Sequence, residues 1–218
     1  MNGLVKPEYG PGLPAIARGL SRGRLLVAAA VLALVVTAVV AALSVREDVR
    51  TQSAVVPGPP LAFNLIWREG QLRRVAAQPG ELLRLETPAG DRAPGSAVVR
   101  PLRLPPYRGE VGGALPIFAT GLVEEMARRL PAFQPRAEGR TRINDLPGYQ
   151  ILFQTEVNGR KAYGKRVILL PDEPGAREGA EVELLSTFSA ATPTPGAVGT
   201  NGALKTPLRS FRFGTERP

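Results

Sequence analysis

Tyr149–Leu170 reads YQILFQTEVNGRKAYGKRVILL and gives the clearest local prediction of fold in the chain. In its first half, apolar and aromatic side chains alternate with polar ones, which is typical of a strand with one buried face. Asn158-Gly159 follows, and this pair is favoured in the two-residue turn of a β-hairpin. The second half, 161–170, is the predicted return strand. The stretch therefore predicts two antiparallel strands joined by a tight turn.

The strands around this hairpin repeat the same pattern. Downstream, apolar and charged side chains alternate over 181–188, so we expect a third antiparallel strand after a loop over 171–180. The Gly-, Pro- and Thr-rich stretch over 190–202 is predicted to be a flexible insertion. Upstream, short strands are predicted over 61–67, 72–76, 82–87 and 97–104.

One amphipathic helix is predicted over 115–130, where Pro116 suits the first turn and Pro131 ends the helix. Its apolar side chains recur every fourth residue and share one face: Phe118, Leu122, Met126 and Leu130. We expect this face to be part of the core. Two ion pairs are expected on the opposite face: Glu124 with Arg128, and Glu125 with Arg129.

The chain's closing segment, 204–213, is predicted to form a short helical turn that docks apolar side chains onto the sheet: Leu208, Phe211 and Phe213. Strands, one central helix and a closing helical turn together indicate an α+β fold. We expect a mainly antiparallel sheet packed with helices. This domain is expected to follow an N-terminal transmembrane helix over 25–44.

Three short motifs extend this prediction to a family: Asn144–Tyr149 before the hairpin, Gly159–Tyr163 in the return strand, and Leu208–Phe211 near the end. With the element order, they resemble the PsbP-like α/β/α sandwich over about residues 61–213. That fold occurs in photosystem II extrinsic proteins and in many bacterial envelope proteins. The resemblance implies a binding or assembly factor and carries over no shared active site.

Leu25–Leu43, LLVAAAVLALVVTAVVAAL, is an unbroken apolar run in which only Thr37 is polar. A helix of this length rises about 1.5 Å per residue and spans about 28 Å, close to a hydrocarbon core of about 30 Å. We therefore expect a single transmembrane helix over 25–44 in the plasma membrane. Four basic residues precede the run: Lys6, Arg18, Arg22 and Arg24. Only Arg46 and Arg50 follow closely, which predicts a cytoplasmic N-terminus and an extracytoplasmic C-terminal domain.

A cleaved secretory signal peptide is the alternative, because the small residues Val40 and Ala42 would permit cleavage. The apolar part of a signal peptide is usually about 7–15 residues long, shorter than this run, so an uncleaved anchor is favoured. Small side chains also recur every fourth position: Ala29, Ala33, Thr37 and Ala41. This stripe would allow a weak homodimer through the helix, and the high Ala content of the run is the simpler explanation.

Composition sets the remaining boundaries. Residues 1–24 are rich in Gly and Pro and are predicted to be a disordered cytoplasmic tail. The polar stretch 45–60 ends in PGPP and is predicted to be a semi-stiff linker. The extracytoplasmic domain then covers 61–213, and 214–218 forms a short tail.

The chain contains no Cys and no His, which limits its chemistry. Disulfides, thiolate catalysis, Ser-His-Asp triads and most zinc sites are excluded. Gly109, Gly112 and Gly113 lack the strand and the Lys-Ser/Thr of a phosphate loop and are interpreted as a loop. Neither a cofactor nor a metal is expected.

The formal charge of +9 would suit nucleic acid or anionic lipid, yet the basic residues are scattered and no module with stacking aromatic side chains accompanies them. No nucleic-acid partner is expected. One basic tract lies on the predicted return strand: Arg160, Lys161, Tyr163, Lys165 and Arg166. It predicts an exposed contact for lipid headgroups, cell-wall polymers or an acidic protein. An edge strand protected by Lys against aggregation is the alternative interpretation.

Other polar residues are interpreted structurally. Asn144 and Asp145 precede Pro-Gly and are expected in a turn rather than in a cation site. Ser210 has no His partner, and Lys205 five residues away is not expected to form a catalytic dyad with it.

The sequence thus predicts a single-pass membrane protein that carries an extracytoplasmic binding or assembly module without catalytic activity. Its expected partners are the lipid bilayer and a protein of the envelope. Two alternatives stay open: an envelope enzyme that uses carboxylates such as Glu124 or Asp145, and an accessory subunit of a transmembrane complex. A deep pocket with converging acids would favour the enzyme.

Overall fold

The computed structural model describes residues 23, 26–27, 30–37, 50–108, 111–173 and 175–216. The chain divides into two compact units, Met1–Asp48 and Val49–Pro218. In the first unit, residues 30–37 are helical, and the Thr37 hydroxyl donates a hydrogen bond of 2.8 Å to the Ala33 carbonyl. This bond satisfies the one polar side chain of the apolar run.

No helix among the described residues is both long enough and apolar enough to cross a membrane. The rest of the span predicted over 25–44 lies outside the described residues, and so do Ala29 and Ala41 of the small-residue stripe. The tail predicted over 1–24 is described only at Gly23. The anchor and the homodimer therefore stay predictions.

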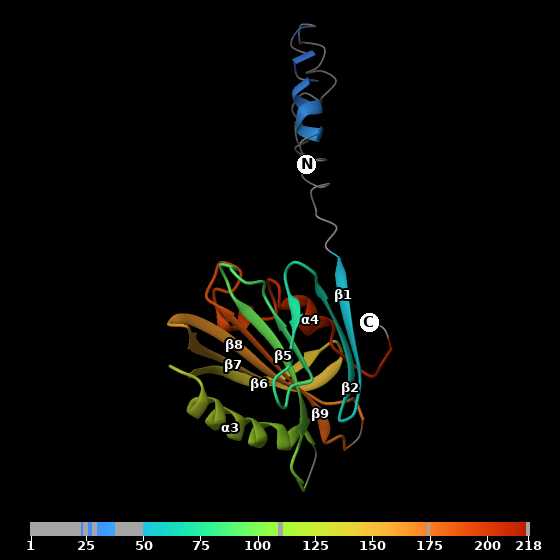
Figure 1. Ribbon diagram of the computed structural model, residues 1–218, viewed down its shortest axis with the longest axis vertical. Coiled ribbons are helices and arrows are strands. Elements are labelled where there is room, and N and C mark those ends of the chain that lie inside the picture. Colours follow the sequence, from blue (N-terminus) through green and yellow to red (C-terminus); the bar gives the residue numbers. More distant parts are fainter. Residues whose placement is uncertain are drawn as a thin grey trace, which may run out of the picture. The chain divides into compact units, whose positions relative to one another are not determined.

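The second unit contains a seven-stranded sheet in which every neighbouring pair of strands is antiparallel, in the order β3-β4-β5-β9-β8-β7-β6 (Figure 1). Along the chain its strands are β3 (Arg73–Val75), β4 (Leu83–Glu86), β5 (Gly95–Arg103), β6 (Gln134–Ile143), β7 (Leu146–Val157), β8 (Arg160–Leu169) and β9 (Glu178–Thr187). A smaller antiparallel sheet has the order β1-β2-β10. It consists of β1 (Thr51–Pro57), β2 (Ala62–Arg68) and β10 (Arg212–Phe213).

The β7–β8 hairpin and its extension to β9 confirm the predicted three-stranded meander. Val157 pairs with Arg160 across the turn, and the two turn residues Asn158 and Gly159 have φ values of 51° and 71°. Two consecutive positive φ angles define the turn that Asn-Gly favours. β9 then pairs with the other side of β8, which places β8 inside the sheet.

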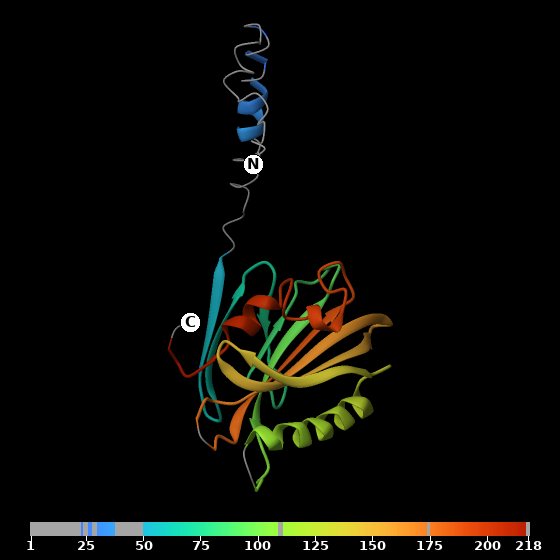
Figure 2. The same ribbon diagram turned by 180° about the vertical axis from the view of Figure 1, so that it is seen from behind.

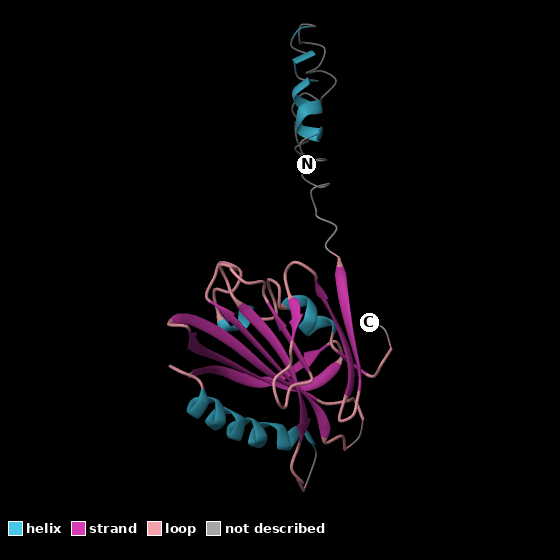
Figure 3. Ribbon diagram, in the orientation of Figure 1, coloured by secondary structure: helices cyan, strands magenta, loops and turns pink. Residues whose placement is uncertain are grey.

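Helix α3 (Val111–Arg129) covers one face of the seven-stranded sheet, as Figures 2 and 3 show. The predicted apolar stripe is confirmed as core, because Leu122 and Met126 are buried against the sheet residues Ile151 and Ile168. Phe118 and Leu130 are partly buried in the same cluster. The ion pairs differ from those expected within the helix. Arg129 pairs with Glu183 of β9, and Glu125 contacts Arg166 of β8.

The other face of the large sheet is covered by the three-stranded sheet and by helix α4 (Lys205–Ser210), with the 3₁₀ turn η1 (Pro195–Ala197) beside them. The closing segment docks as predicted, because Leu208 and Phe211 are buried and the Phe211 ring stacks on Phe63 at 5.4 Å. The domain is therefore α+β with antiparallel sheets and few helices. The predicted α/β/α sandwich has helices on both faces of the sheet. Here one face is covered mainly by the strands of the three-stranded sheet.

Three segments differ from the prediction. Residues 51–57 of the predicted linker form β1, which pairs with β2 along its whole length, although Ala54 is its only fully buried residue. The unpredicted strand β6 is a largely exposed edge strand. Both strands are held by backbone pairing and lack the apolar alternation that marks a strand in sequence. In the insertion predicted over 190–202, Ala197 and Val198 are buried, so this part is packed.

Candidate binding surfaces and a buried ion-pair network

The basic tract predicted on β8 does not form one exposed patch. Tyr163, Lys165 and Arg166 are only 6%, 7% and 3% exposed, while Arg160 and Lys161 are exposed. Alternate residues of a strand face opposite sides, so Arg166 faces α3 and Lys165 faces the other layer. The edge-strand alternative is wrong as well, because β8 lies between β7 and β9.

The two exposed residues of this tract make contacts within the chain. The Lys161 amino group lies 5.0 Å from the centre of the Tyr163 ring and 5.7 Å from that of the Phe188 ring. Both distances suit cation–π attraction. Arg160 donates a hydrogen bond of 3.0 Å to the Arg92 carbonyl. An anionic contact therefore stays a prediction for Arg160 and Lys161 alone.

Lys165 is only 7% exposed, and its side chain lies on the core face of β8 with Arg209 near its amino group. Its register neighbours are Leu152 on β7 and Leu184 on β9, and it makes no ion pair within residues 50–108, 111–173 and 175–216. Burial lowers the pKa of its amino group, and the positive charge of Arg209 lowers it further. Folding therefore disfavours the charged form of Lys165.

Replacing Lys165 by Met is expected to stabilise the protein at pH 7 by about 1–2 kcal/mol, because an unpaired buried charge is exchanged for an apolar side chain of similar size. The lowered pKa means that the unfolded chain binds the proton more readily, so the wild-type free energy of unfolding rises as pH approaches the ordinary Lys value of 10.5. The advantage of Lys165→Met is thus expected to shrink from pH 7 to pH 10. Urea unfolding at both pH values measures it.

The exposed Lys205 on α4 provides the matched control. Lys205→Met is expected to leave the free energy of unfolding nearly unchanged at both pH values. Destabilisation by Lys165→Met at both values would contradict the interpretation of Lys165 as an unpaired amine.

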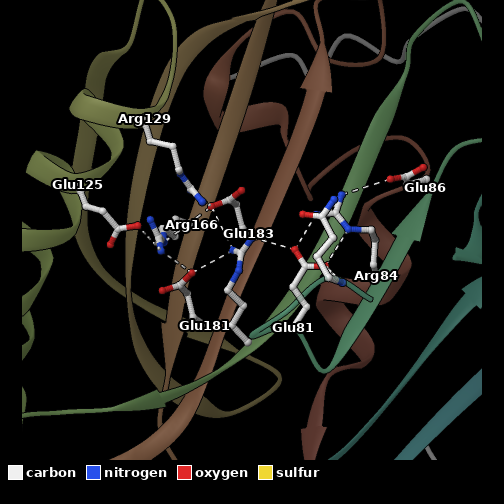
Figure 4. Close-up of polar contacts among 10 residues, drawn as sticks. Glu81, Arg84, Glu86, Glu125, Arg129, Arg166, Glu181 and Glu183 are labelled. Atoms are coloured by element: carbon white, nitrogen blue, oxygen red, sulfur yellow. Dashed lines mark hydrogen bonds and ion pairs between the residues drawn. The ribbon is translucent and has the colours of Figure 1, made fainter. Parts of the chain in front are cut away.

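A network of Arg and Glu side chains crosses the α3 face of the large sheet (Figure 4). At one end, Arg166 Nη2 lies 2.6 Å from Glu181 Oε1. In the middle, the Arg100 guanidinium lies 3.3 Å from Glu181 and 3.4 Å from Glu183. Arg100 also contacts Glu81 at 3.1 Å, which continues the network to the segment just before β4.

Three further contacts extend the network. On the β4 side, Arg84 pairs with Glu81 at 2.6 Å and with Glu86 at 3.2 Å. On the helix side, Arg129 of α3 pairs with Glu183 at 3.1 Å. The network thus links the helix to four neighbouring strands.

Strand register brings these residues together. Glu183 pairs directly with Arg166, and Glu181 pairs directly with Arg100, so opposite charges face each other across adjacent strands. The sequence analysis missed the network because its members come from distant strands. The one signal was the acids at alternate positions of β9, between residues that proved to be core.

The Glu81 side chain is only 2% exposed. A hydrogen bond from Arg84 is the largest cause that lowers its pKa from 4.5 to about 2, and the pKa of Arg84 is raised by the same bond. A lowered carboxyl pKa stabilises the folded state above pH 4.5, and this stabilisation is lost as pH falls toward 2. The carboxylate is thus held ionised, which suits a structural ion pair.

The carboxylates proposed for an enzyme lie on separate elements. Glu124 is exposed on α3, and Asp145 is exposed in the turn between β6 and β7. Asn144 and Asp145 have φ values of 48° and 67°, which confirms their predicted role in a turn. Among the described residues, no group of three or more acidic side chains could hold a metal ion.

Two other candidates have structural roles. The Ser210 hydroxyl donates to the Thr206 carbonyl at 2.8 Å and accepts a hydrogen bond of 2.9 Å from the Ile66 amide, so it ties α4 to β2. Gly112 and Gly113, expected in a loop, lie in the first turn of α3. Gly109 lies outside the described residues.

An apolar groove of 510 Å³ runs between α3 and the segment that follows β5. Its walls are Pro105–Tyr107 on one side and Ile117, Phe118, Leu122 and Glu125 of α3 on the other. Ile117 is 63% exposed and Tyr107 37% exposed, so both present apolar surface to solvent. Arg177 holds the first wall by donating to the carbonyls of Pro105 and Tyr107 at 3.2 and 3.1 Å. The sequence analysis assigned Ile117 no role, because it lies outside the apolar stripe of the helix.

No protein-family model matches the chain, and no curated protein matches it. Solved structures with a similar trace include LpqN of Mycobacterium tuberculosis, described as involved in cell envelope biogenesis. It is 15% identical, with 77% of this chain and 94% of that chain covered and a TM-score of 0.49.

Two further structures show a comparable degree of similarity. The Ran-binding protein Mog1p of Saccharomyces cerevisiae is 9% identical, with 76% and 96% covered and a TM-score of 0.48. The cyanobacterial PsbP of Synechocystis is 11% identical, with 77% and 95% covered and a TM-score of 0.47.

Proposed function

We propose that the chain is a single-pass membrane protein whose C-terminal domain, of PsbP-like architecture, binds a protein partner in the cell envelope. The apolar groove between α3 and Pro105–Tyr107 carries this proposal. Exposed large apolar side chains that line a groove are typical of protein-binding surfaces.

The anchor is supported by the apolar run and by the side chains described within it. Among the described residues of the first unit, all the exposed large apolar side chains lie on the run: Leu26, Val27, Val31, Leu32, Leu34, Val35 and Val36. Such a helix is stable in a bilayer, where these side chains meet lipid. The charge bias supports a cytoplasmic N-terminus and an extracytoplasmic domain.

The lining of the groove indicates the chemistry of its proposed occupant. Apolar side chains dominate it, and Glu125 is its one charged residue. Glu125 is about half exposed and lies 3.9 Å from Arg166, whose Nη2 already contacts Glu181 at 2.6 Å. The Glu125 carboxylate is thus weakly paired and open to a second cation. We infer that the groove takes an aliphatic peptide segment that carries a basic side chain beside Glu125.

A non-catalytic role is supported by the acids of the domain. Glu81 and Glu181 both form ion pairs with Arg100. Glu124 and Asp145 lie on separate elements. The accessory subunit of a transmembrane complex is a specific form of the same binding role.

Ile117→Asp is expected to weaken peptide binding at least tenfold, because it places a charge in the middle of an apolar contact worth about 1.5–3 kcal/mol for the Ile side chain. The full chain in lipid nanodiscs would be used to select binders from a random peptide library. Fluorescence anisotropy then compares the Kd of the selected peptides for the wild type and the variant.

The matched control is Ala127→Asp, which puts the same charge on an exposed position of α3 outside the groove. It is expected to leave the Kd unchanged. Selected peptides that are acidic, or that bind Ile117→Asp as tightly as wild type, would contradict the proposed occupant. So would a library that yields no binder.

Topology is tested separately by protease protection on sealed membranes, with a tag at each end of the chain. An intact membrane-bound chain whose C-terminal domain alone is digested from outside is expected. A soluble product that lacks the apolar run would refute the anchor and establish a cleaved signal peptide.

A further inference from the structure

We propose a second binding site, for a neutral, hydroxyl-rich ligand such as a single sugar unit, in a pocket among the loops at one end of the large sheet. Four connections meet there: β2 to β3, β4 to β5, β9 to η1, and η1 to α4. Figure 1 shows these loops at the upper end of the domain and α3 at its lower side. The apolar groove is lined by α3 and so lies away from these loops.

The pocket has a volume of 270 Å³ and is built around small residues. Seven of its fifteen lining residues are Gly or Ala: Gly70, Gly95, Gly199, Gly202, Ala93, Ala191 and Ala203. At Gly199, with φ of +71°, a Cβ atom would lie 2.6 Å from the Leu184 side chain, so a larger residue cannot occupy this wall. The small residues keep the space open.

The other walls present polar atoms with unused hydrogen-bonding capacity. The side-chain amides of Gln71 and Asn201 make no hydrogen bond within the described residues. Asp91 accepts one hydrogen bond at Oδ1, from the Ala93 amide, and its second oxygen is not engaged. Thr87 and Ser189 each accept a hydrogen bond from a backbone amide, which leaves their hydroxyl protons to donate.

The charge of the pocket excludes the commonest other ligands. Asp91 is its only charged lining residue, so phosphate, sulfate and carboxylate ligands would meet a negative charge without a cation. Polar groups lie on several sides, which disfavours a lipid chain. Each hydroxyl of a sugar both donates and accepts, and this matches two amides, two hydroxyls and one carboxylate.

An aromatic side chain lies near the same pocket. Phe188 is 53% exposed, and its ring centre lies 6.2 Å from that of Tyr163. Tyr163 pairs across the strands with Ser186, which lines the pocket and bonds to Thr192 beside it. Phe188 is not itself a lining residue, but it directly precedes Ser189 of the lining, and the C–H face of a sugar could pack on its exposed ring.

The site is tested by saturation-transfer NMR on the full chain in nanodiscs of deuterated lipid, with glucose, galactose, mannose and N-acetylglucosamine as separate probes. At least one sugar is expected to give a saturable signal. Asn201→Ala is expected to weaken that binding about five- to tenfold, and Ala191→Leu, which fills the pocket, is expected to abolish it. Short oligomers of the bound sugar distinguish a polymer end from a free sugar as the source.

The control is Gln134→Ala, which removes an exposed amide from the edge strand β6, and it is expected to bind like wild type. Circular dichroism checks that each variant is folded. No saturable signal from any of the four sugars would overturn the proposal, and so would binding that persists unchanged in Ala191→Leu. Inorganic phosphate is included as a fifth probe, and pocket-dependent phosphate binding would overturn it as well.

Discussion

Replacing Arg166 by Met is expected to destabilise the protein by about 3–5 kcal/mol, because breaking a buried ion pair leaves the partner carboxylate without its closest cation. Arg166 and Glu181 are both almost fully buried, and their closest atoms lie 2.6 Å apart. Without Arg166, Glu181 keeps only its longer contact with Arg100 at 3.3 Å. Urea unfolding of the full chain in detergent, followed by the fluorescence of the buried Trp67, measures the loss.

Arg103 offers a matched control, since it pairs with Glu178 at 3.7 Å and both side chains are well exposed. Arg103→Met is expected to change the free energy of unfolding by less than about 1 kcal/mol. The double variant Arg166→Met with Glu181→Met is expected to recover much of the lost stability, because it also removes the Glu181 carboxylate that has lost its closest partner. If Arg166→Met cost no more than Arg103→Met, the network would not be a structural element of the domain.

Gly164→Ala is expected to cost about 3 kcal/mol, the upper end of the range for overpacking a core. Gly164 pairs with Phe153 across β7 and β8, and a Cβ atom there would lie 2.0 Å from Cζ of the Phe153 ring. Phe153 is 1% exposed and packs against Phe133 at 5.6 Å, so its ring has little room to move. The same urea titration measures the effect.

Gly139→Ala on the edge strand β6 is the control, because nothing lies within 4 Å of a Cβ atom at that position. It is expected to be nearly neutral. A double variant with Phe153→Leu is expected to show a coupling energy of at least about 1 kcal/mol with Gly164→Ala, since the smaller side chain relieves the clash. Equal effects at Gly164 and Gly139 would rule out the clash as the cause.

The features predicted correctly were those encoded by neighbouring residues. The β7–β8 hairpin follows from alternation and from Asn158-Gly159, and the buried face of α3 follows from side chains four residues apart. The three-stranded meander was predicted, but the burial of both faces of β8 depends on the layers that pack on the sheet, α3 on one face and the three-stranded sheet with α4 on the other, which no local pattern records. For this reason Lys165 and Arg166 were taken as exposed, although the sheet buries both.

The candidate sites were harder to predict than the fold. The groove needs Tyr107 and Ile117 to meet, and the sugar pocket needs four loops from distant parts of the chain. Exposed edge strands such as β6 also escape prediction, because their stability comes from backbone hydrogen bonds rather than from apolar side chains. A sequence pattern records burial along one element and does not record which elements become neighbours.

The two hydrogen bonds from Arg177 affect how the groove would recognise a partner. They fix the Pro105–Tyr107 wall from the side of β9, so this wall is in place before anything binds. A partner would then spend little of its binding free energy on ordering the chain. A groove built in advance selects its ligands by shape, and an aliphatic segment that fits the fixed space is favoured over one that requires the wall to move.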